Sequence, residues 1–253
     1  MERGGVTPAP SPPHPPRRLR DAAPPPDRTD RDTAWLIRPA GLVPYADAYD
    51  WMHTMAERRF RGEIPDTLIL LEHPPVYTAG KRWDPSHLVW AEEAMRAAGA
   101  EFHLVDRGGS VTFHGPGQLV GYPLVDLGPG RDVVGYVRRL EEVIIRAGED
   151  AGLTGLSRNP ANSGVWAGDR KVCAIGVRVA RARVTLHGFA LNCTTDLSWY
   201  EAIVPCGLTD HGVTSLSEVA GRTVTVEEMI PRVIHHFESA FGRALQPGPD
   251  LGP

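Results

Sequence analysis

The segment that decides the fold reads Arg107-Gly108-Gly109-Ser110-Val111-Thr112-Phe113-His114-Gly115-Pro116-Gly117-Gln118. Its glycines flank one short β-rich run, and glycine beside a strand costs stability unless the backbone must approach something closely. No Gly-Lys-Ser/Thr follows and no helical pattern opens after it, which excludes a P-loop and a dinucleotide fingerprint. The glycine spacing alone favours an ordinary pair of tight turns. The alternative is a wall against an elongated ligand, with Arg107 and His114 as polar contacts.

Strands and helices alternate on both sides of this segment. Continuous apolar or β-branched runs predict strands at 35–37, 67–71, 102–105, 111–113, 119–125, 172–179 and 184–191, the last two joined as a hairpin. Apolar residues at helical spacing predict helices at 44–60 and 133–151. A last helix starts at Thr225, with Glu228 completing a capping box and Pro231 disturbing its first turn. This order predicts an α+β fold with mixed, mainly antiparallel sheets flanked by helices.

Composition separates the two ends of the chain from its middle. Residues 1–33 are rich in proline and arginine and, like residues 246–253, are predicted to be disordered tails around one folded domain at 34–245. The formal net charge is −4, which gives no support for nucleic-acid binding. We find no apolar run that could cross a bilayer and no signal-peptide core, so the prediction is a soluble cytoplasmic protein without a membrane partner.

The three cysteines are Cys173, Cys193 and Cys206. Their odd number and the lack of a Cys-x-x-Cys pair argue against a disulfide framework and a thiolate zinc site, and no metal is predicted. Cys206 lies between Pro205 and Gly207, a bend that can present a thiol as a nucleophile. Cys173 and Cys193 lie within apolar runs and are predicted to be core residues, with Cys173 a weak rival nucleophile.

A nucleophilic thiol needs help to ionise, because its reference pKa is roughly 8.5. His187 and His211 are candidate partners, and spacing does not distinguish them. Lys171 is another candidate, since a nearby ammonium favours the thiolate and lysine can release and regain a proton. The alternative for Lys171 is a solvated strand end. Asn192 is either a turn residue or an active-site donor, whereas His73 to Pro75 and Asp126 are interpreted as structural.

Several segments together resemble the lipoyl(octanoyl) transferase family: Glu72 to Thr78, Arg107 to Gln118, Gly164-Val165-Trp166, Lys171 to Gly176, His187 to Asn192 and Pro205-Cys206-Gly207. The resemblance runs in order from about Trp35 to Gly242. It implies the fold of biotin protein ligases and lipoate-protein ligases. It also implies transfer of an octanoyl group from octanoyl-acyl carrier protein to the acceptor lysine of lipoyl domains, those of 2-oxoacid dehydrogenase E2 subunits and of the glycine cleavage H protein.

The resemblance implies a role for each matched residue. Cys206 forms the acyl-thioester and Lys171 lowers its pKa. The acyl pocket is implied to be lined by Arg107, Gly108, Gly109, Ser110, Val111, Thr112, Phe113, His114, Ala174, Ile175, Gly176, Gly188, Phe189 and Ala190. A thioester donor needs no cofactor, metal or ATP. The chain departs from the pattern in its proline-rich extension, in Cys173, and in the loop 157–162, which lacks a glycine.

Other functions stay open from sequence alone. An ATP-dependent lipoate-protein ligase of the same fold would not need Cys206. A non-catalytic acyl- or cofactor-binding module would bind without turnover, and a cysteine hydrolase would release free acid. Acyl carrier proteins are generally acidic, so either Arg178, Arg181 and Arg183, or Lys81 with Arg82, are candidate docking contacts. A solvated surface is the plainer interpretation of both groups.

Overall fold

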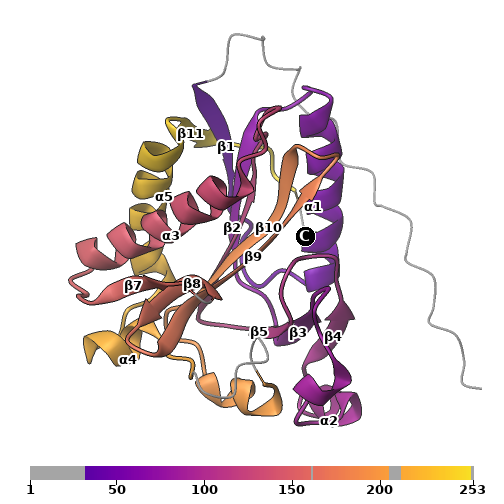
Figure 1. Cartoon of the computed structure of the whole chain (residues 1–253), viewed down its shortest axis with the longest axis vertical. Helices are drawn as coiled ribbons and strands as arrows, with labels where there is room; N and C mark the ends of the chain where they lie inside the picture. The colour runs from indigo at the N-terminus through magenta and orange to yellow at the C-terminus, as the bar shows by residue number, and fades with distance from the viewer. Residues whose placement is uncertain (1–31, 161, 205–211, 252–253) are drawn as a thin grey trace, which may run out of the picture.

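The computed structural model describes residues 32–160, 162–204 and 212–251. Residues 1–31 of the predicted N-terminal tail lie outside the described residues, and so do Cys206 and His211. Within the described part the chain forms two β-sheets and five α-helices (Figure 1).

The larger sheet has eight strands in the order β11-β1-β2-β6-β10-β9-β8-β7. Its central pairs are antiparallel, while β1 runs parallel to β2 and to β11. The predicted mixed, mainly antiparallel α+β fold is therefore confirmed. The bounds are β1 Thr33–Ile37, β2 Asp66–Leu71, β6 Gln118–Leu124, β7 Leu156–Asn159, β8 Asn162–Ala167, β9 Arg170–Ala180, β10 Val184–Asn192 and β11 Ala244–Pro247.

The smaller sheet has three strands in the order β4-β3-β5. Its strands are β3 Val76–Ala79, β4 Glu101–Leu104 and β5 Val111–His114. The α-helices are α1 Tyr45–Phe60, α2 Glu92–Ala97, α3 Val133–Asp150, α4 Leu216–Ala220 and α5 Val226–Phe241, and two 3₁₀ helices are η1 Pro85–His87 and η2 Leu197–Ala202. The predicted strands and long helices are each present, with ends that differ by one or two residues.

Helices cover both faces of the larger sheet. α3 and α5 lie on one face and α1 on the other (Figure 1). In β2, Leu68 and Leu70 point into the core under α3 and α5, whereas Ile69 and Leu71 point into the core under α1. Successive strand residues face opposite sides, so a strand covered on both sides must be apolar throughout. The continuous apolar run in the sequence follows from this burial.

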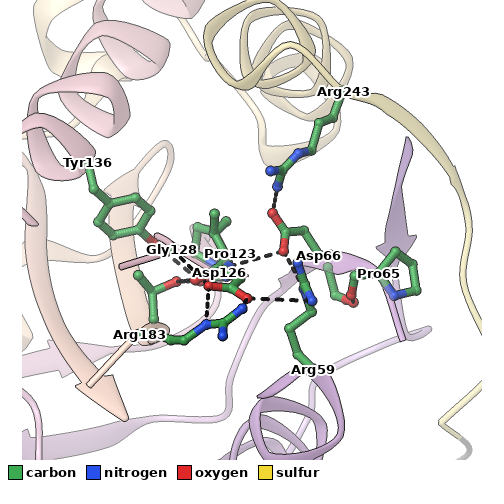
Figure 2. Close-up of polar contacts among 12 residues, drawn as sticks. Arg59, Pro65, Asp66, Pro123, Asp126, Gly128, Tyr136, Arg183 and Arg243 are labelled. Carbon is green, nitrogen blue, oxygen red and sulfur yellow. Dashed lines mark hydrogen bonds and ion pairs between the residues drawn. The ribbon is translucent and has the colours of Figure 1, made fainter. Parts of the chain in front are cut away.

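A cluster of ion pairs joins elements that are far apart in the chain (Figure 2). Asp66, which is 3% exposed, accepts from Arg59 Nε at 2.6 Å and from the backbone N–H of Asp126 at 3.0 Å, and it also pairs with Arg243. Asp126 in turn accepts from Arg183 Nε at 2.7 Å. The cluster ties α1, β2, the loop after β6, the turn before β10 and the end of α5. Asp126 is thus structural, as predicted.

The predicted C-terminal tail is wrong at its start. Gln246 and Pro247 belong to β11, whose partner is β1, and the N–H of Gly248 donates to Leu36 O at 2.8 Å. The N-terminal boundary also shifts, because β1 already begins at Thr33. Pairing with β1, which lies near the other end of the described chain, stabilises β11. The composition of residues 244–247 does not itself indicate a strand.

Three local details also differ from expectation. Thr225 caps α5 by accepting from the N–H of Glu228, but the Glu228 carboxylate pairs with Arg222, so only half of the capping box forms. α5 continues through Pro231 to its end at Phe241. The segment predicted as a loop at 157–162 falls largely within the β7–β8 hairpin.

Candidate functional site

A cavity of about 430 Å³ lies over the paired strands β9 and β10. The predicted pocket residues that line it are Arg107, Gly108, Gly109, Ser110, Val111, Thr112, His114, Ala174, Ile175, Gly176, Gly188, Phe189 and Ala190, and Lys171 lines it too. Segments that are distant in the sequence therefore meet in one concave site. A cavity of this size is within the usual range for small-molecule sites.

The glycine-rich segment after Arg107 forms one wall of this cavity. The N–H of Gly108 donates to Val177 O at 3.1 Å, and a Cβ atom at Gly176 would lie 3.1 Å from Gly108 O. The Arg107 guanidinium donates to Ser110 O at 2.8 Å and to Thr78 O at 2.6 Å. Glycine at Gly176 lets the wall approach β9 closely, because any side chain there would push Gly108 back by a few tenths of an ångström. The structure thus agrees with the wall interpretation of this segment.

Phe113 was predicted to line the pocket and does not. Its ring packs in the core of the small sheet, stacked on Trp199 with a centroid separation of 5.3 Å. The motif that suggested a pocket covers a strand, and neighbouring strand residues point to different sides. Assigning every residue of a strand motif to the pocket therefore includes side chains that face away from it.

Several cavity residues were not assigned to a pocket from the sequence: Tyr45, Arg82, Val120, Tyr122, Val137, Asn162, Ser163, Val177 and His187. Val177 and His187 are a registered pair one step beyond Gly176 and Gly188. Both lie within the predicted hairpin, and extending the two predicted pocket segments by one residue would have found them. The other residues come from α1, α3, β6, β8 and the turn after β3, and the sequence carries no signal for their approach.

His187 is a strained residue in the wall. Its backbone has φ 58° in the middle of β10, an unusual value for a residue other than glycine. Its Nε2 lies 2.7 Å from Asp106 Oδ1, and Asp106 also pairs with Arg178. Burial and the nearby Arg107 charge lower the pKa of His187, so a neutral imidazole donates to Asp106.

A buried chain of hydrogen bonds leads from the cavity to the strand-like segment after residue 211. His114 Nδ1 lies 2.7 Å from Gln118 Oε1, and burial holds the pKa of His114 well below its usual range. Gln118 Nε2 donates to Asn192 Oδ1 at 2.9 Å, and Asn192 Nδ2 donates to Thr214 O at 3.0 Å. Asn192 ends β10, does not line the cavity itself, and forms a buried link between these groups.

Lys171 is buried in the second position of β9. Its side chain lines the cavity, with Nζ 4.8 Å from the centroid of the Trp166 ring. Its backbone N–H donates to Gly212 O at 2.9 Å, and its carbonyl accepts from the N–H of Thr214 at 3.0 Å. Lys171 is therefore not a solvated strand end, and it contacts the chain directly after the undescribed residues 205–211.

The chain directly before residues 205–211 is also attached to the cavity wall. The N–H of Val204 donates to His87 O at 2.8 Å, and His87 Nδ1 lies 2.7 Å from Ser110 Oγ. Ser110 lines the cavity. The two described ends around the segment that contains Cys206 thus lie at two cavity-lining residues, Ser110 and Lys171.

Cys173 and Cys193 are core residues, as predicted. Both have no exposed surface, and neither lines the cavity. Burial raises the pKa of Cys193 to about 12 and raises that of Cys173 as well. A thiol held protonated inside an apolar core is a poor nucleophile.

The described ranges hold neither a cluster of metal ligands nor a membrane-spanning helix. They contain no group of three or more His, Cys, Asp or Glu side chains placed to hold a metal ion. No helix within them has both the length and the apolar character needed to cross a membrane.

Comparison with known proteins connects this site to a family. Residues 44–238 match the family of the lipoyl protein ligase A/B catalytic domain. The octanoyltransferase of Mycobacterium marinum is 54% identical over 218 residues, which is 83% of this chain and 89% of that protein. The octanoyltransferase of Rubrobacter xylanophilus is 49% identical over 203 residues, 80% of this chain and 91% of that protein.

Solved structures agree at the level of the fold. The crystal structure of lipoate-protein ligase A bound with ATP superposes with a TM-score of 0.69 at 16% identity, covering 85% of this chain and 87% of that one. The Ta0514 protein of T. acidophilum, described as a putative lipoate protein ligase, gives 0.65 at 15% identity, covering 85% and 87%. The fold expected from the resemblance to lipoate-protein ligases is confirmed.

Proposed function

Because this chain belongs to the lipoyl protein ligase A/B catalytic-domain family and is an acyltransferase that moves octanoyl groups in protein lipoylation, we propose that it does so through a thioester on Cys206. The donor is octanoyl-acyl carrier protein. The acceptor is the lysine of a lipoyl domain, as carried by 2-oxoacid dehydrogenase E2 subunits and the glycine cleavage H protein. The reaction draws on the energy of the donor thioester and uses no ATP.

The observation that carries the proposal is the state of the other two thiols. The chain has three cysteines, and both Cys173 and Cys193 are buried outside the cavity with raised pKa values. Cys206 is left as the candidate nucleophile. It follows Val204 by two residues in the sequence, and the chain on either side of its segment is bonded at Ser110, through His87, and at Lys171.

Lys171 supports the proposal by its position. It is an ammonium group on the cavity wall of a site that otherwise holds many apolar side chains, and its backbone is paired with the segment that follows the nucleophile. A positive charge beside a thiol favours the thiolate. Lysine also exchanges a proton readily, which arginine does not.

In the first step the Cys206 thiolate attacks the carbonyl carbon of the donor thioester. A new carbon–sulfur bond forms to Cys206, and the bond to the carrier thiol breaks. Lys171 gives its proton to the departing thiolate, so the carrier leaves as a neutral thiol and Lys171 becomes a neutral amine.

In the second step the amine of the acceptor lysine attacks the thioester on Cys206. The carbon–nitrogen bond of the amide forms, and the Cys206 sulfur leaves as a thiolate. Neutral Lys171 takes the proton released by the acceptor amine, which restores the ammonium and the thiolate for the next cycle. One residue thus acts first as acid and then as base.

The cavity suits an acyl chain. Val111, Val120, Ile175 and Phe189 give it apolar surface, and each methylene group buried there contributes about 0.8 kcal/mol. Gly176 and Gly188 also line the cavity, and a Cβ atom at Gly188 would lie 2.2 Å from Gly121 O, so glycine there permits close packing of β10 on β6.

Intact-mass spectrometry tests the proposal. The protein is mixed with octanoyl-acyl carrier protein without ATP, beside Cys206→Ala and a matched Cys193→Ala control. We expect an octanoyl adduct on the unsubstituted protein and on Cys193→Ala, and none on Cys206→Ala. An adduct on folded Cys206→Ala would refute the covalent step, and transfer that needs ATP and free octanoate would identify a ligase.

A further inference from the structure

Three arginines of the β9–β10 hairpin are each paired with a carboxylate. Arg178 pairs with Asp106, Arg181 Nε lies 3.1 Å from Glu57 Oε2, and Arg183 pairs with Asp126. These three arginines formed one of the two groups considered for carrier docking. Because each one already contacts an acid, this group offers little net charge to a partner.

Lys81 and Arg82 differ from that group. Both are exposed, and neither forms an ion pair within the described part of the chain. Arg82 lines the acyl cavity itself, so the pair lies at a point where the cavity meets solvent. Lys81 is one of only two lysines in the chain, and the other is Lys171.

The backbone fixes this turn to the cavity wall. The N–H groups of Gly80, Lys81 and Arg82 donate to Ser110 O, Arg107 O and Gly109 O, each at 3.0 Å. A Cβ atom at Gly80 would lie 2.6 Å from Gly109 O, so the turn sits directly against the wall. These backbone contacts therefore fix the two charged residues beside the cavity.

The nearest carboxylate along the chain does not neutralise the pair. Asp84 caps η1, where it accepts from the N–H of Ser86 at 2.9 Å and from Ser86 Oγ at 2.6 Å. An exposed and unpaired positive patch beside a ligand entrance attracts anionic partners and raises their rate of encounter.

We propose that Lys81 and Arg82 form the docking contact for the acidic protein that delivers the acyl chain. This inference rests on the proposed function, since it assumes a carrier-linked thioester donor. The carrier's acidic surface meets the turn at residues 80–82 while its acyl arm enters the cavity beside Arg82. Removing both charges weakens capture of the carrier more strongly than it affects a donor without a carrier protein.

The test compares two donors, octanoyl-acyl carrier protein and the uncharged thioester octanoyl-pantetheine, and adds octanoyl-coenzyme A as a third donor that carries phosphate groups but no protein. For each we measure kcat/KM with the full chain, with Lys81→Ala/Arg82→Ala, and with Arg61→Ala/Arg181→Ala. The last variant loses the same charge from exposed positions at the end of α1 and at the β9–β10 turn. We expect the ratio of the carrier value to the pantetheine value to fall roughly tenfold in Lys81→Ala/Arg82→Ala. The control should keep the wild-type ratio.

Salt gives a second readout. The difference between the unsubstituted protein and Lys81→Ala/Arg82→Ala should shrink as salt rises from 0.1 M to 1 M, because the screening length falls from about 10 Å to about 3 Å. A difference that does not change with salt would contradict an electrostatic contact.

Other outcomes separate this proposal from the proposed function. An equal fall with both donors, an equal fall in the control, or a rise confined to the KM of the lipoyl-domain acceptor would overturn the docking contact. An equal fall with octanoyl-coenzyme A would assign the charges to phosphate groups and not to the carrier protein, which also overturns it. If the unsubstituted protein uses neither thioester, the proposed function itself fails.

Discussion

Replacing Lys171 with methionine separates the chemistry of the ammonium group from its structural surroundings. Methionine keeps an unbranched side chain of similar length, and the backbone bonds from residue 171 to Gly212 and Thr214 do not depend on the side chain. The contact of Nζ with the Trp166 ring is lost, which costs about 2 kcal/mol of stability for a buried pair. We therefore expect a folded protein whose segment after residue 211 is still attached.

The effect on catalysis should be much larger than the effect on stability. A positioned acid or base contributes typically about 10²–10⁴-fold to rate, and in the proposed mechanism Lys171 serves both half-reactions. Octanoyl transfer by Lys171→Met should thus fall by about that factor in kcat. Quenched-flow intact-mass measurements would follow acylation of the enzyme and transfer to a lipoyl domain separately.

Lys171→Arg is the matched control, because it keeps the positive charge but does not release a proton near neutral pH. We expect it to acylate faster than Lys171→Met and to remain slow in transfer. Transfer by Lys171→Met within threefold of the unsubstituted rate would refute the assignment. Equal acylation by the two variants would refute the role of the charge.

Three other positions carry predictions on stability, pH dependence and acyl preference. Asp66→Ala breaks a buried pair and should lower the unfolding free energy in urea by about 3–5 kcal/mol. Half-buried Glu142→Ala should lower it by less than about 1 kcal/mol, and equal losses would contradict this. Burial lowers the pKa of His73 from 6.5 to about 4, so unfolding takes up a proton and stability falls as pH drops through that window. His73→Gln should remove roughly 1 kcal/mol per pH unit of that slope, and an unchanged slope would count against it. Gly176→Val presses on the wall at Gly108 and Arg107 and narrows the cavity, and it should shift kcat/KM from octanoyl toward hexanoyl donors by roughly tenfold, whereas an unchanged ratio would rule out this placement of the chain.

The sheet and its covering helices could be predicted because burial leaves a direct trace in the sequence. β2 is covered on both faces, and its continuous apolar run shows this. α5 could be located from its capping threonine and its apolar spacing. β11 could not be predicted, because Gln246 and Pro247 have no strand propensity of their own and are held by pairing with β1.

The cavity was predictable in outline only. Glycines mark a close backbone approach, and together with the family resemblance they located the wall near Gly176. Strand alternation and the approach of distant elements decide which side chains line the cavity. Neither can be read from a motif, so the prediction included Phe113, which packs in the core, and omitted Tyr122, which lines the cavity. The roles of Cys206 and Lys171 stay predictions until the acyl-enzyme is measured.

The C-terminal strand also governs how copies of the molecule meet one another. On the free side of β11 the N–H of Leu245 donates to Glu238 Oε1 at 2.7 Å, and Pro247 has no N–H to offer. Leu245 and Pro247 therefore offer no free N–H for pairing with another chain, which weakens edge-to-edge association. A protein shortened after Arg243 would lose this cover and bare the edge of β1, with Trp35 and Ile37. We expect such a truncated chain to self-associate and scatter light as its concentration rises, so the last residues protect solubility.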